Sequence, residues 1–164
     1  MITANDIENF NNIDNFKDCK MSTCNDRSHT ESWHQEQIFK FAEGAERSFP
    51  ELRWMHHIPN GGMRGNDPRT RAIQGASMKR QGVKSGVADI FLPASRSGYN
   101  GLYIELKRPD LKPKKKTSKG GVSDEQADFG RYVIKQGFKW VVSYGSEEAI
   151  LEILNYLQEV ELNK

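Results

Sequence analysis

The stretch GVADIFL, residues 86–92, and the stretch LYIELK, residues 102–107, decide how this chain folds. Both are rich in aliphatic and aromatic residues and predict two short buried strands. Charged side chains interrupt them at Asp89, Glu105 and Lys107. Because an unpaired charge is costly outside water, such a group normally becomes neutral, forms a pair or binds a metal. We therefore expect these three side chains to have a function.

Alternation along a strand places two of these charges together. Glu105 and Lys107 project from one face of their strand, while the aliphatic residues that alternate with them project from the other face. The strand of Asp89 can pair with this one through residues 93–101, which contain the turn signals Ser-Gly and Asn-Gly. The pairing predicts a pocket with two carboxylates and an ammonium group.

Such a pocket has the chemistry of a divalent-cation site. Mg²⁺ prefers carboxylate oxygens and keeps several waters, so two carboxylates leave room for a scissile phosphate and an attacking water. The ammonium group of Lys107 can hold that water or offset the charge of the transition state. The residues therefore predict phosphodiester hydrolysis, with Mg²⁺ or Mn²⁺ as the cofactor.

The spacing D-x15-E-x-K resembles the PD-(D/E)xK nuclease superfamily and, more closely, the VRR-NUC family within it. Segment 50–64, which contains PELRW and HIPNGGMR, resembles the first strand and loop of that family. Segment 81–89, QGVKSGVAD, resembles its approach to the catalytic Asp, although the family often has Pro where this chain has Ala88. These blocks occur in order, and the resemblance spans roughly residues 31–145.

The resemblance implies a metal-dependent DNA endonuclease. Asp89 and Glu105 would bind the metal, with the main-chain carbonyl of Leu106 as a further ligand. Lys107 would orient or activate the water. Stand-alone members of this size are similar to Holliday-junction resolvases, which act as homodimers because a four-way junction needs two symmetric cuts. We therefore expect a homodimer that acts on branched DNA; a flap or restriction-like nuclease, a DNA-binding module without cleavage and a purely structural protein are the alternatives.

Glu31 is a further candidate for the site. It lies at the start of an expected helix, on the same face as Ile38 and Ala42, and this face points toward the sheet. By resemblance, its carboxylate can reach the metal directly or through water. Alternatively, Glu31 stabilises the helix N-terminus through the macrodipole. Glu36 falls on the face expected to be solvated and ranks lower.

Gln126 is the last candidate for the catalytic group. It follows Ser123 at the spacing of a capping box, so helix capping is one explanation. However, it shares a helix face with Phe129 and Val133, and an inward amide needs hydrogen-bond partners. The family that the chain resembles has a Gln here, beside the catalytic Lys, and this favours a role in the site.

Positive charge is concentrated in one part of the chain. Residues 53–119 hold 15 Lys and Arg and four Asp and Glu, a net charge of +11, in a chain whose total net charge is +2. Such asymmetry suits a polyanion, and a Gly-rich turn can bring backbone close to DNA. The predicted DNA-binding residues are Asn60, Gly61, Gly62, Arg64, Arg69, Arg71, Lys84, Arg108, Lys114, Lys115 and Lys116. Alternatively, the basic residues form only a solvated surface.

Length and cysteine content limit the class of protein. A chain of 164 residues is normal for one domain, and no stretch is apolar enough to cross a membrane. The first residues lack a secretory-signal pattern and two cysteines make no disulfide framework, so we expect a cytoplasmic protein. Cys19, Cys24, His29 and His34 recur at intervals of five, but this spacing is far shorter than in a common zinc finger, so a zinc site is not favoured.

The fold class expected from these patterns is α/β. Residues 1–28, rich in Asn, Asp, Ser and Thr, predict a flexible or irregular arm, and residues 29–164 predict a nuclease-like domain. This domain is expected to have a restriction-endonuclease-like core, with a mixed sheet flanked by helices in the order α-β-α-β-β-α-β-α. Besides the two strands quoted first, its expected elements are helices over 31–47 (capped by Thr30), 69–81, 123–136 and 146–159 (capped by Ser146) and strands over 53–58 and 139–144.

Overall fold

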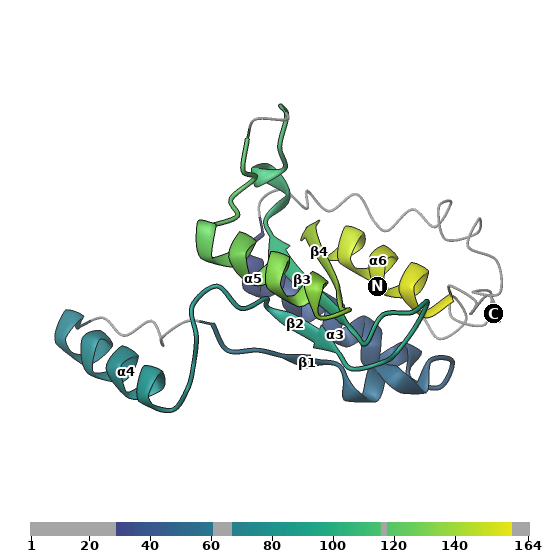
Figure 1. Ribbon diagram of the computed structural model, residues 1–164, viewed down its shortest axis with the longest axis horizontal. Coiled ribbons are helices and arrows are strands. Elements are labelled where there is room, and N and C mark those ends of the chain that lie inside the picture. The colour runs from purple at the N-terminus through teal and green to yellow at the C-terminus, as the bar shows by residue number, and fades with distance from the viewer. Residues whose placement is uncertain (1–28, 61–66, 116–117, 159–164) are drawn as a thin grey trace.

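The computed structural model describes residues 29–60, 67–115 and 118–158 (Figure 1). The predicted N-terminal arm, residues 1–28, lies outside the described residues. Within these ranges, no helix has both the length and the hydrophobicity that a membrane crossing requires.

Helices and strands follow one another in the predicted order. The α-helices are α3 (Glu31–Ala45), α4 (Pro68–Arg80), α5 (Asp124–Lys135) and α6 (Ser146–Gln158). The strands are β1 (His56–His57), β2 (Ile90–Leu92), β3 (Leu102–Lys107) and β4 (Lys139–Tyr144). Two short 3-10 helices, η2 (Pro50–Trp54) and η3 (Pro109–Leu111), follow α3 and β3.

The strands form one mixed sheet in the order β1-β2-β3-β4. β2 pairs antiparallel with both β1 and β3, and Ile90 of β2 lies opposite Ile104 of β3. β3 and β4 are parallel, with Glu105 opposite Val142, and α5 connects them. Parallel neighbours need such a crossover connection. The predicted α/β class with a mixed sheet is therefore confirmed.

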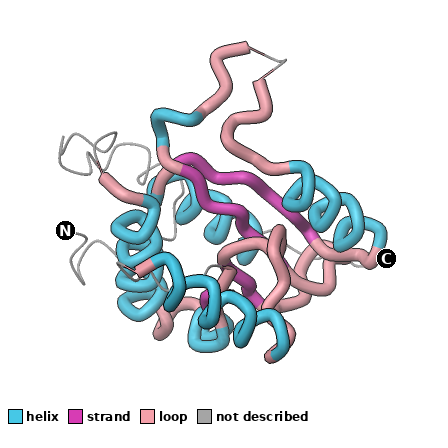
Figure 2. Tube along the Cα trace, turned by 90° about the vertical axis from the view of Figure 1, so that its left-hand side faces the viewer, coloured by secondary structure: helices cyan, strands magenta, loops and turns pink. Residues whose placement is uncertain are grey.

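Helices lie on both sides of the sheet (Figure 2). The side chains of Leu102, Ile104 and Leu106 on β3 are fully buried in a core that they share with α3 and α6. On the opposite face, the ring of Tyr103 packs edge-on against Phe129 of α5, with centroids 5.2 Å apart. The alternation of side chains along β3 thus separates an apolar core face from a face that meets α5.

Polar side chains define where two of the helices begin. Oγ1 of Thr30 accepts a hydrogen bond from the amide of Trp33 at 3.3 Å, which confirms the predicted N-cap of α3. Ser123 caps α5 in the same way. Ser146, predicted to cap the last helix, is instead the first residue of α6, and its amide donates to Nδ1 of His34 at 3.2 Å.

The predicted strand over residues 53–58 is wrong for most of its length. Residues Pro50–Trp54 form η2, and only His56 and His57 pair with β2. Proline favours the first position of a helix, because its φ is already close to the helical value and it has no N–H to satisfy. Leu52 is then buried beneath this turn, so the helical conformation keeps the contact with the core.

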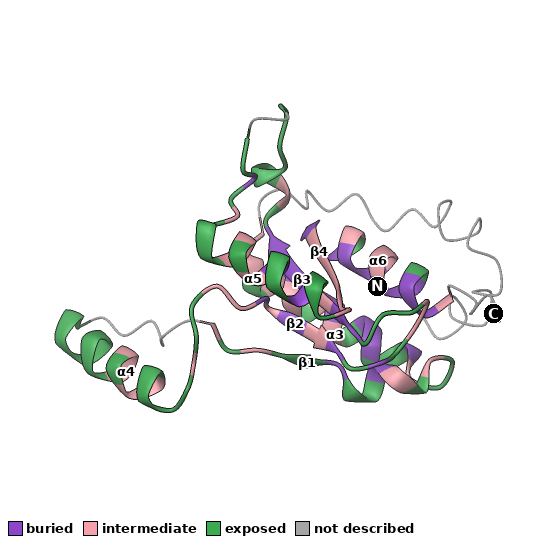
Figure 3. Ribbon diagram, in the orientation of Figure 1, coloured by how far each residue is buried: buried purple, intermediate pink, exposed green. Residues whose placement is uncertain are grey.

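Helix α4 lies apart from the rest of the described fold (Figure 1). None of its residues is buried, as its colours in Figure 3 show. Its start is defined locally, because the carboxylate of Asp67 accepts hydrogen bonds from the amides of Arg69 and Thr70 at 3.2 and 2.8 Å and Pro68 occupies the first position. Local sequence signals, rather than packing, therefore specify this helix.

Candidate active site

The three charged side chains of the predicted site lie together on the α5 face of the sheet. Asp89 immediately precedes β2, and because Ile90 pairs with Ile104, Asp89 falls across from Glu105. Nζ of Lys107 lies 2.7 Å from Oε1 of Glu105, two positions along the same strand. The two carboxylates and the ammonium group therefore meet at one place, at the end of β3 that is close to the start of α5.

Gln126, on the first turn of α5, joins this group. Its Nε2 donates a hydrogen bond to Oε1 of Glu105, the same oxygen that contacts Lys107. At the other end of the amide, Oε1 accepts from the main-chain nitrogen of Ser123 at 2.9 Å and completes a capping box. The capping explanation is thus confirmed, and the role in the site stays a prediction that the contact with Glu105 is compatible with.

Asp89 is held through its side chain and its main chain. Oδ2 accepts from the amide of Leu106 at 2.8 Å, and Oδ1 accepts from Nδ2 of Asn60 at 3.2 Å. The main-chain carbonyl accepts from the amide of Ile58 at 2.8 Å and lies 2.9 Å from Nδ1 of His57. The sequence analysis gave His57 no role, because its contact joins residues 32 positions apart and no local pattern marks it.

Burial and charge shift the pKa of both ionisable groups on β3. Burial, and then the negative charge of Asp89, raise the pKa of Glu105 to about 7 from an ordinary value of 4.5, although Lys107 opposes this change. For Lys107, burial lowers the pKa, but the hydrogen bond and charge of Glu105, together with Glu31 and Asp89, raise it overall. Lys107 therefore stays protonated, and Glu105 is an unusually basic carboxylate that a cation would stabilise.

Glu31 lies where the sequence analysis expected it, at the edge of this group. It is the first residue of α3 and is half-buried, and its negative charge acts on Lys107. Glu36, which ranked lower, is exposed. A position beside the ammonium group is compatible with a role in the site as well as with the alternative, stabilisation of the N-terminus of α3.

The available ligands fit a hard divalent cation with few protein contacts. Among the residues that the structure describes, no group of three or more His, Cys, Asp or Glu is arranged to hold a metal. Mg²⁺ often binds through only one or two carboxylates and keeps its remaining waters. Within the same described residues, Oε2 of Glu105 is buried without a hydrogen-bond partner. Asp89 and Glu105 therefore fit Mg²⁺ or Mn²⁺, and the role of the Leu106 carbonyl stays a prediction.

The histidines of the disfavoured zinc arrangement have other contacts. Cys19 and Cys24 lie outside the described residues. His34 is fully buried, and its Nδ1 accepts from the amide of Ser146 at 3.2 Å, so it joins α3 to α6. His29 stacks on the ring of Trp33, with centroids 3.9 Å apart.

The predicted DNA-binding residues are spread over the surface. Gly61, Gly62, Arg64 and Lys116 lie outside the described residues. Arg69 and Arg71 are exposed on α4, the helix that lies apart from the sheet in Figure 1. Asn60 is half-buried, and its amide faces Asp89. The remaining four residues, Lys84, Arg108, Lys114 and Lys115, are exposed.

Part of the positive charge is balanced by nearby carboxylates. Arg108 pairs with Asp110 at 2.8 Å. Between β3 and α5, Lys112 pairs with Glu148 at 2.8 Å, and Lys119 pairs with Asp124 at 2.6 Å. The charge available to a polyanion is therefore smaller than the sequence count suggests, since these three cations already have an anionic partner.

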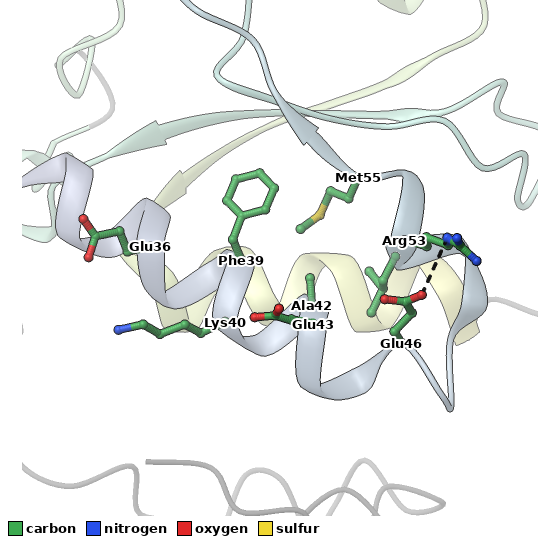
Figure 4. A pocket seen from close by; sticks show the side chains of 9 residues that line it. Glu36, Phe39, Lys40, Ala42, Glu43, Glu46, Arg53 and Met55 are labelled. Atoms are coloured by element: carbon green, nitrogen blue, oxygen red, sulfur yellow. Dashed lines mark ion pairs between the residues drawn. The ribbon is translucent and has the colours of Figure 1, made fainter.

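A pocket of about 600 Å³ lies between α3 and η2, and its lining on α3 runs from Glu36 to Glu43 (Figure 4). Phe39, Leu52 and Met55 provide apolar lining, and an ion pair of 4.0 Å between Arg53 and Glu46 crosses its rim. None of the residues predicted to act in catalysis lines this pocket. The candidate active site is instead the group of ionisable side chains on the opposite face of the sheet.

A solved structure supports the architecture that the motifs predict. A VRR_NUC domain protein is similar to this chain, with a TM-score of 0.59 and 24% sequence identity, over 80% of this chain and 91% of that chain. This chain has a VRR-NUC-like fold. No protein-family model matches the sequence, and no curated protein matches it. The fold expected from the sequence resemblance is therefore confirmed in three dimensions.

Close packing holds the segments that carry the candidate site of this VRR-NUC-like fold together. Gly86, in the loop before Asp89, has a φ of +83°, and a Cβ there would lie 2.8 Å from the main-chain carbon of Glu125. Only glycine adopts this conformation readily and leaves room for the first turn of α5. The loop and α5 thus pack against each other where Asp89 and Gln126 begin their contacts with β3.

Proposed function

We propose that this chain is a divalent-metal-dependent DNA endonuclease that hydrolyses phosphodiester bonds. The observation that carries this proposal is the meeting of Asp89, Glu105 and Lys107 on one face of the sheet, at the positions of the motif D-x15-E-x-K. Apolar residues can often replace a buried ion pair at little cost in stability, so the presence of these charges favours a chemical role. The VRR-NUC-like fold is the fold in which such a role is expected.

In the proposed reaction, Asp89 and Glu105 bind Mg²⁺ or Mn²⁺, with the Leu106 carbonyl as a further ligand. When bound, the cation supplies Lewis-acid stabilisation of the negative charge that develops on the phosphate. Lys107 holds the attacking water or offsets that charge. It can do so while it contacts Glu105, because an ammonium group has three donor hydrogens and this contact uses one.

Two more side chains support the reacting groups. Gln126 keeps the carboxylate of Glu105 oriented through the hydrogen bond from Nε2. Glu31 acts from the start of α3, where its charge already reaches Lys107, and contacts the cation directly or through water. The support for these two roles is the contact of Gln126 with Glu105 and the effect of the Glu31 charge on Lys107.

The proposed substrate is branched DNA, a four-way junction in particular, and the proposed active form is a homodimer. The support is the resemblance of the chain to stand-alone junction resolvases, in which two copies make symmetric cuts. Five exposed cations that form no ion pair with the other described residues, Arg69, Arg71, Lys84, Lys114 and Lys115, are proposed to contact phosphates. A flap or restriction-like nuclease is the alternative within the same chemistry.

A DNA-binding protein without cleavage is a second candidate. The observation that favours it is the ion pair between Lys107 and Glu105, because the ammonium group already balances a carboxylate that the metal would need. The two candidates differ in one measurable respect. The nuclease cuts DNA when Mg²⁺ or Mn²⁺ is added, whereas the binding protein retains DNA and leaves it intact.

Replacement of Asp89 tests the reaction. The Asp89→Asn variant should lose Mn²⁺-dependent cleavage of a labelled four-way junction and stay folded, with a lower thermal midpoint because an amide can replace only one of the two accepting oxygens. Asp128→Asn is the matched control, because Asp128 is exposed on α5 and pairs only with Arg131 among the interactions seen. This control should cut at the wild-type rate. Cleavage that persists in Asp89→Asn, or that persists in EDTA, would contradict the proposal.

A panel of DNA shapes tests the substrate. Labelled four-way junctions, flaps, single strands and linear duplexes would be incubated with and without Mn²⁺. Symmetric nicks in the junction alone are expected, with a mass in solution that corresponds to two chains. Equal degradation of every substrate would reject the resolvase specificity and leave the nuclease activity in place.

A further inference from the structure

Residues 57–60 contact both the main-chain carbonyl and the side-chain carboxylate of Asp89. The carbonyl of Asp89 accepts from the amide of Ile58 and lies beside Nδ1 of His57, while its Oδ1 accepts from Nδ2 of Asn60 at 3.2 Å. The same Nδ2 also donates to the main-chain carbonyl of Val87. Asn60 therefore connects β1 to the loop that carries Asp89, and it contacts both the main chain of that loop and the carboxylate.

We propose that Asn60 is a positioning residue that fixes the carboxylate of Asp89 for cation binding. This inference rests on the proposed nuclease function. It replaces the role expected from the sequence, in which Asn60 belongs to a Gly-rich turn that grips the DNA backbone. The two roles differ in what the side-chain amide does, and the hydrogen bonds decide between them.

The partners of Asn60 determine which way its amide points. The carbonyl oxygen of Val87 and the carboxylate of Asp89 only accept hydrogen bonds. A flipped amide would place its own acceptor oxygen against two acceptors, so the nitrogen must face them. Both N–H hydrogens are then used within the protein. Asn60 has no side-chain hydrogen left to donate to a phosphate.

Hydrogen bonds on both oxygens hold the carboxylate of Asp89 in one orientation. Oδ2 accepts from the amide of Leu106 at 2.8 Å, and Oδ1 accepts from Asn60. A single bond would allow rotation about Cβ–Cγ, whereas one bond on each oxygen prevents it. Each carboxylate oxygen has a second acceptor direction, so both remain able to face a cation. Groups that orient a ligand in this way commonly contribute about 10- to 100-fold to metal affinity or activity.

The other end of the Asn60 amide is its oxygen, which contacts neither Val87 nor Asp89. Its Oδ1 is buried and, among the residues that the structure describes, accepts no hydrogen bond. Because Asn60 also donates two hydrogen bonds within the protein, the positioning role has to be measured as Mn²⁺ affinity in variants that remain folded.

The variants Asn60→Ala and Asn60→Leu test this proposal, the second because it keeps the side-chain volume. Calorimetric titration with Mn²⁺ should give an affinity about 10- to 100-fold weaker than that of the wild type, and kcat should fall by a similar factor. KM and the Kd for junction DNA in EDTA should stay unchanged. Asn155→Ala and Asn155→Leu are matched controls, because Asn155 is exposed on α6, and they should match the wild type.

Each other outcome has a definite meaning. A weaker Kd for DNA in EDTA with unchanged Mn²⁺ affinity would overturn the positioning role and restore the DNA contact. Wild-type Mn²⁺ affinity and kcat in folded Asn60 variants would also overturn it, even where Asp89→Asn loses both properties as expected. If the wild type neither binds Mn²⁺ nor cuts DNA, the proposed function itself fails, and the positioning role fails with it.

Discussion

Gln126 and Glu105 are joined by a hydrogen bond from the amide nitrogen of the first to Oε1 of the second, across 21 positions of sequence. The amide oxygen of Gln126 accepts from the main chain of Ser123 at the same time. The start of α5 and the orientation of a buried carboxylate therefore depend on one side chain. Because the two contacts use opposite ends of the amide, mutation can separate them.

The Gln126→Glu variant should keep the cap and damage the site. A carboxylate can still accept from the amide of Ser123, as in the Ser-x-x-Glu form of the capping box. It cannot donate to Glu105, and it adds a like charge there, which raises the pKa of Glu105 further. We expect cleavage at neutral pH to fall about 10- to 100-fold.

Ser123→Ala is the matched control for Gln126→Glu. It removes the hydroxyl that accepts from the amide of Gln126 at 3.2 Å and leaves the bond to Glu105 in place. Loss of an N-cap costs about 1 kcal/mol of stability, which thermal unfolding would detect. Cleavage by Ser123→Ala should stay near the wild-type rate. A similar loss of activity in both variants would mean that only the helix start matters.

The raised pKa of Glu105 makes stability depend on pH. An unfolded Glu titrates near 4.5 and folded Glu105 near 7, so between these values the folded state holds more protons than the unfolded state. Stability from this residue is therefore present below pH 4.5 and lost as the pH rises through 7. The expected loss is up to about 3 kcal/mol. Lys107 stays charged throughout this window, because its pKa is raised from 10.5.

The measurement compares the wild type with Glu105→Gln by urea unfolding across this pH range. A comparison is needed because three exposed carboxylates with lowered pKa values, Asp67, Asp124 and Glu125, change stability in the opposite direction. Their effect is common to both proteins and cancels in the difference. The wild type should lose stability relative to the variant as the pH rises. An unchanged difference would mean that Glu105 titrates normally.

Lys107→Met should destabilise the protein at pH 8 by about 3–5 kcal/mol, because Glu105 must then stay ionised and buried without its cation or take up a proton. The cost should shrink at low pH, where Glu105 is protonated. The double variant Glu105→Leu/Lys107→Met should recover the lost stability, since apolar groups can replace a buried ion pair. Both proteins should be inactive. A double variant that is less stable than Lys107→Met would show that the charges serve the fold.

Gly86→Ala should disturb the site more than Gly82→Ala. Both glycines have positive φ, +83° and +91°, so alanine is strained by about 1–2 kcal/mol at either position. At Gly86 the new Cβ would also lie within 3 Å of the main chain of Glu125, whereas at Gly82 nothing lies within 4 Å. We expect Gly86→Ala to lose more thermal stability than Gly82→Ala. Only Gly86→Ala should also lose Mn²⁺ binding. Equal losses in the two variants would mean that the packing of Gly86 against α5 does not matter for the site.

Lysines that have no acidic partner among the described residues should contribute most to DNA affinity. Lys114→Ala/Lys115→Ala should weaken junction binding in EDTA and reduce the slope of log K against log salt by about one per lost phosphate contact. Lys112→Ala/Lys119→Ala removes the same net charge, but these lysines already pair with Glu148 and Asp124. The second pair should change the slope less. Equal changes would indicate that only net charge matters.

The elements that the sequence predicted best are those whose signals are local. Thr30 and Ser123 cap their helices as expected, because capping joins residues three positions apart. The strand expected over residues 53–58 was wrong, since apolar content there did not distinguish a strand from the 3-10 helix that buries Leu52. The isolated position of α4 was not predicted either, because its own cap and proline specify the helix without indicating what it packs against.

The sequence by itself determined that Glu105 and Lys107 share one face of a buried strand, because alternation along β3 is a property of the backbone. It also determined a mixed α/β fold through the order of its periodic segments. Only the tertiary structure decided that Asn60 reaches Asp89, 29 positions away, and that Gln126 reaches Glu105. Such contacts depend on how strands and helices pack in space, and no local period in the chain encodes the distance between their side chains.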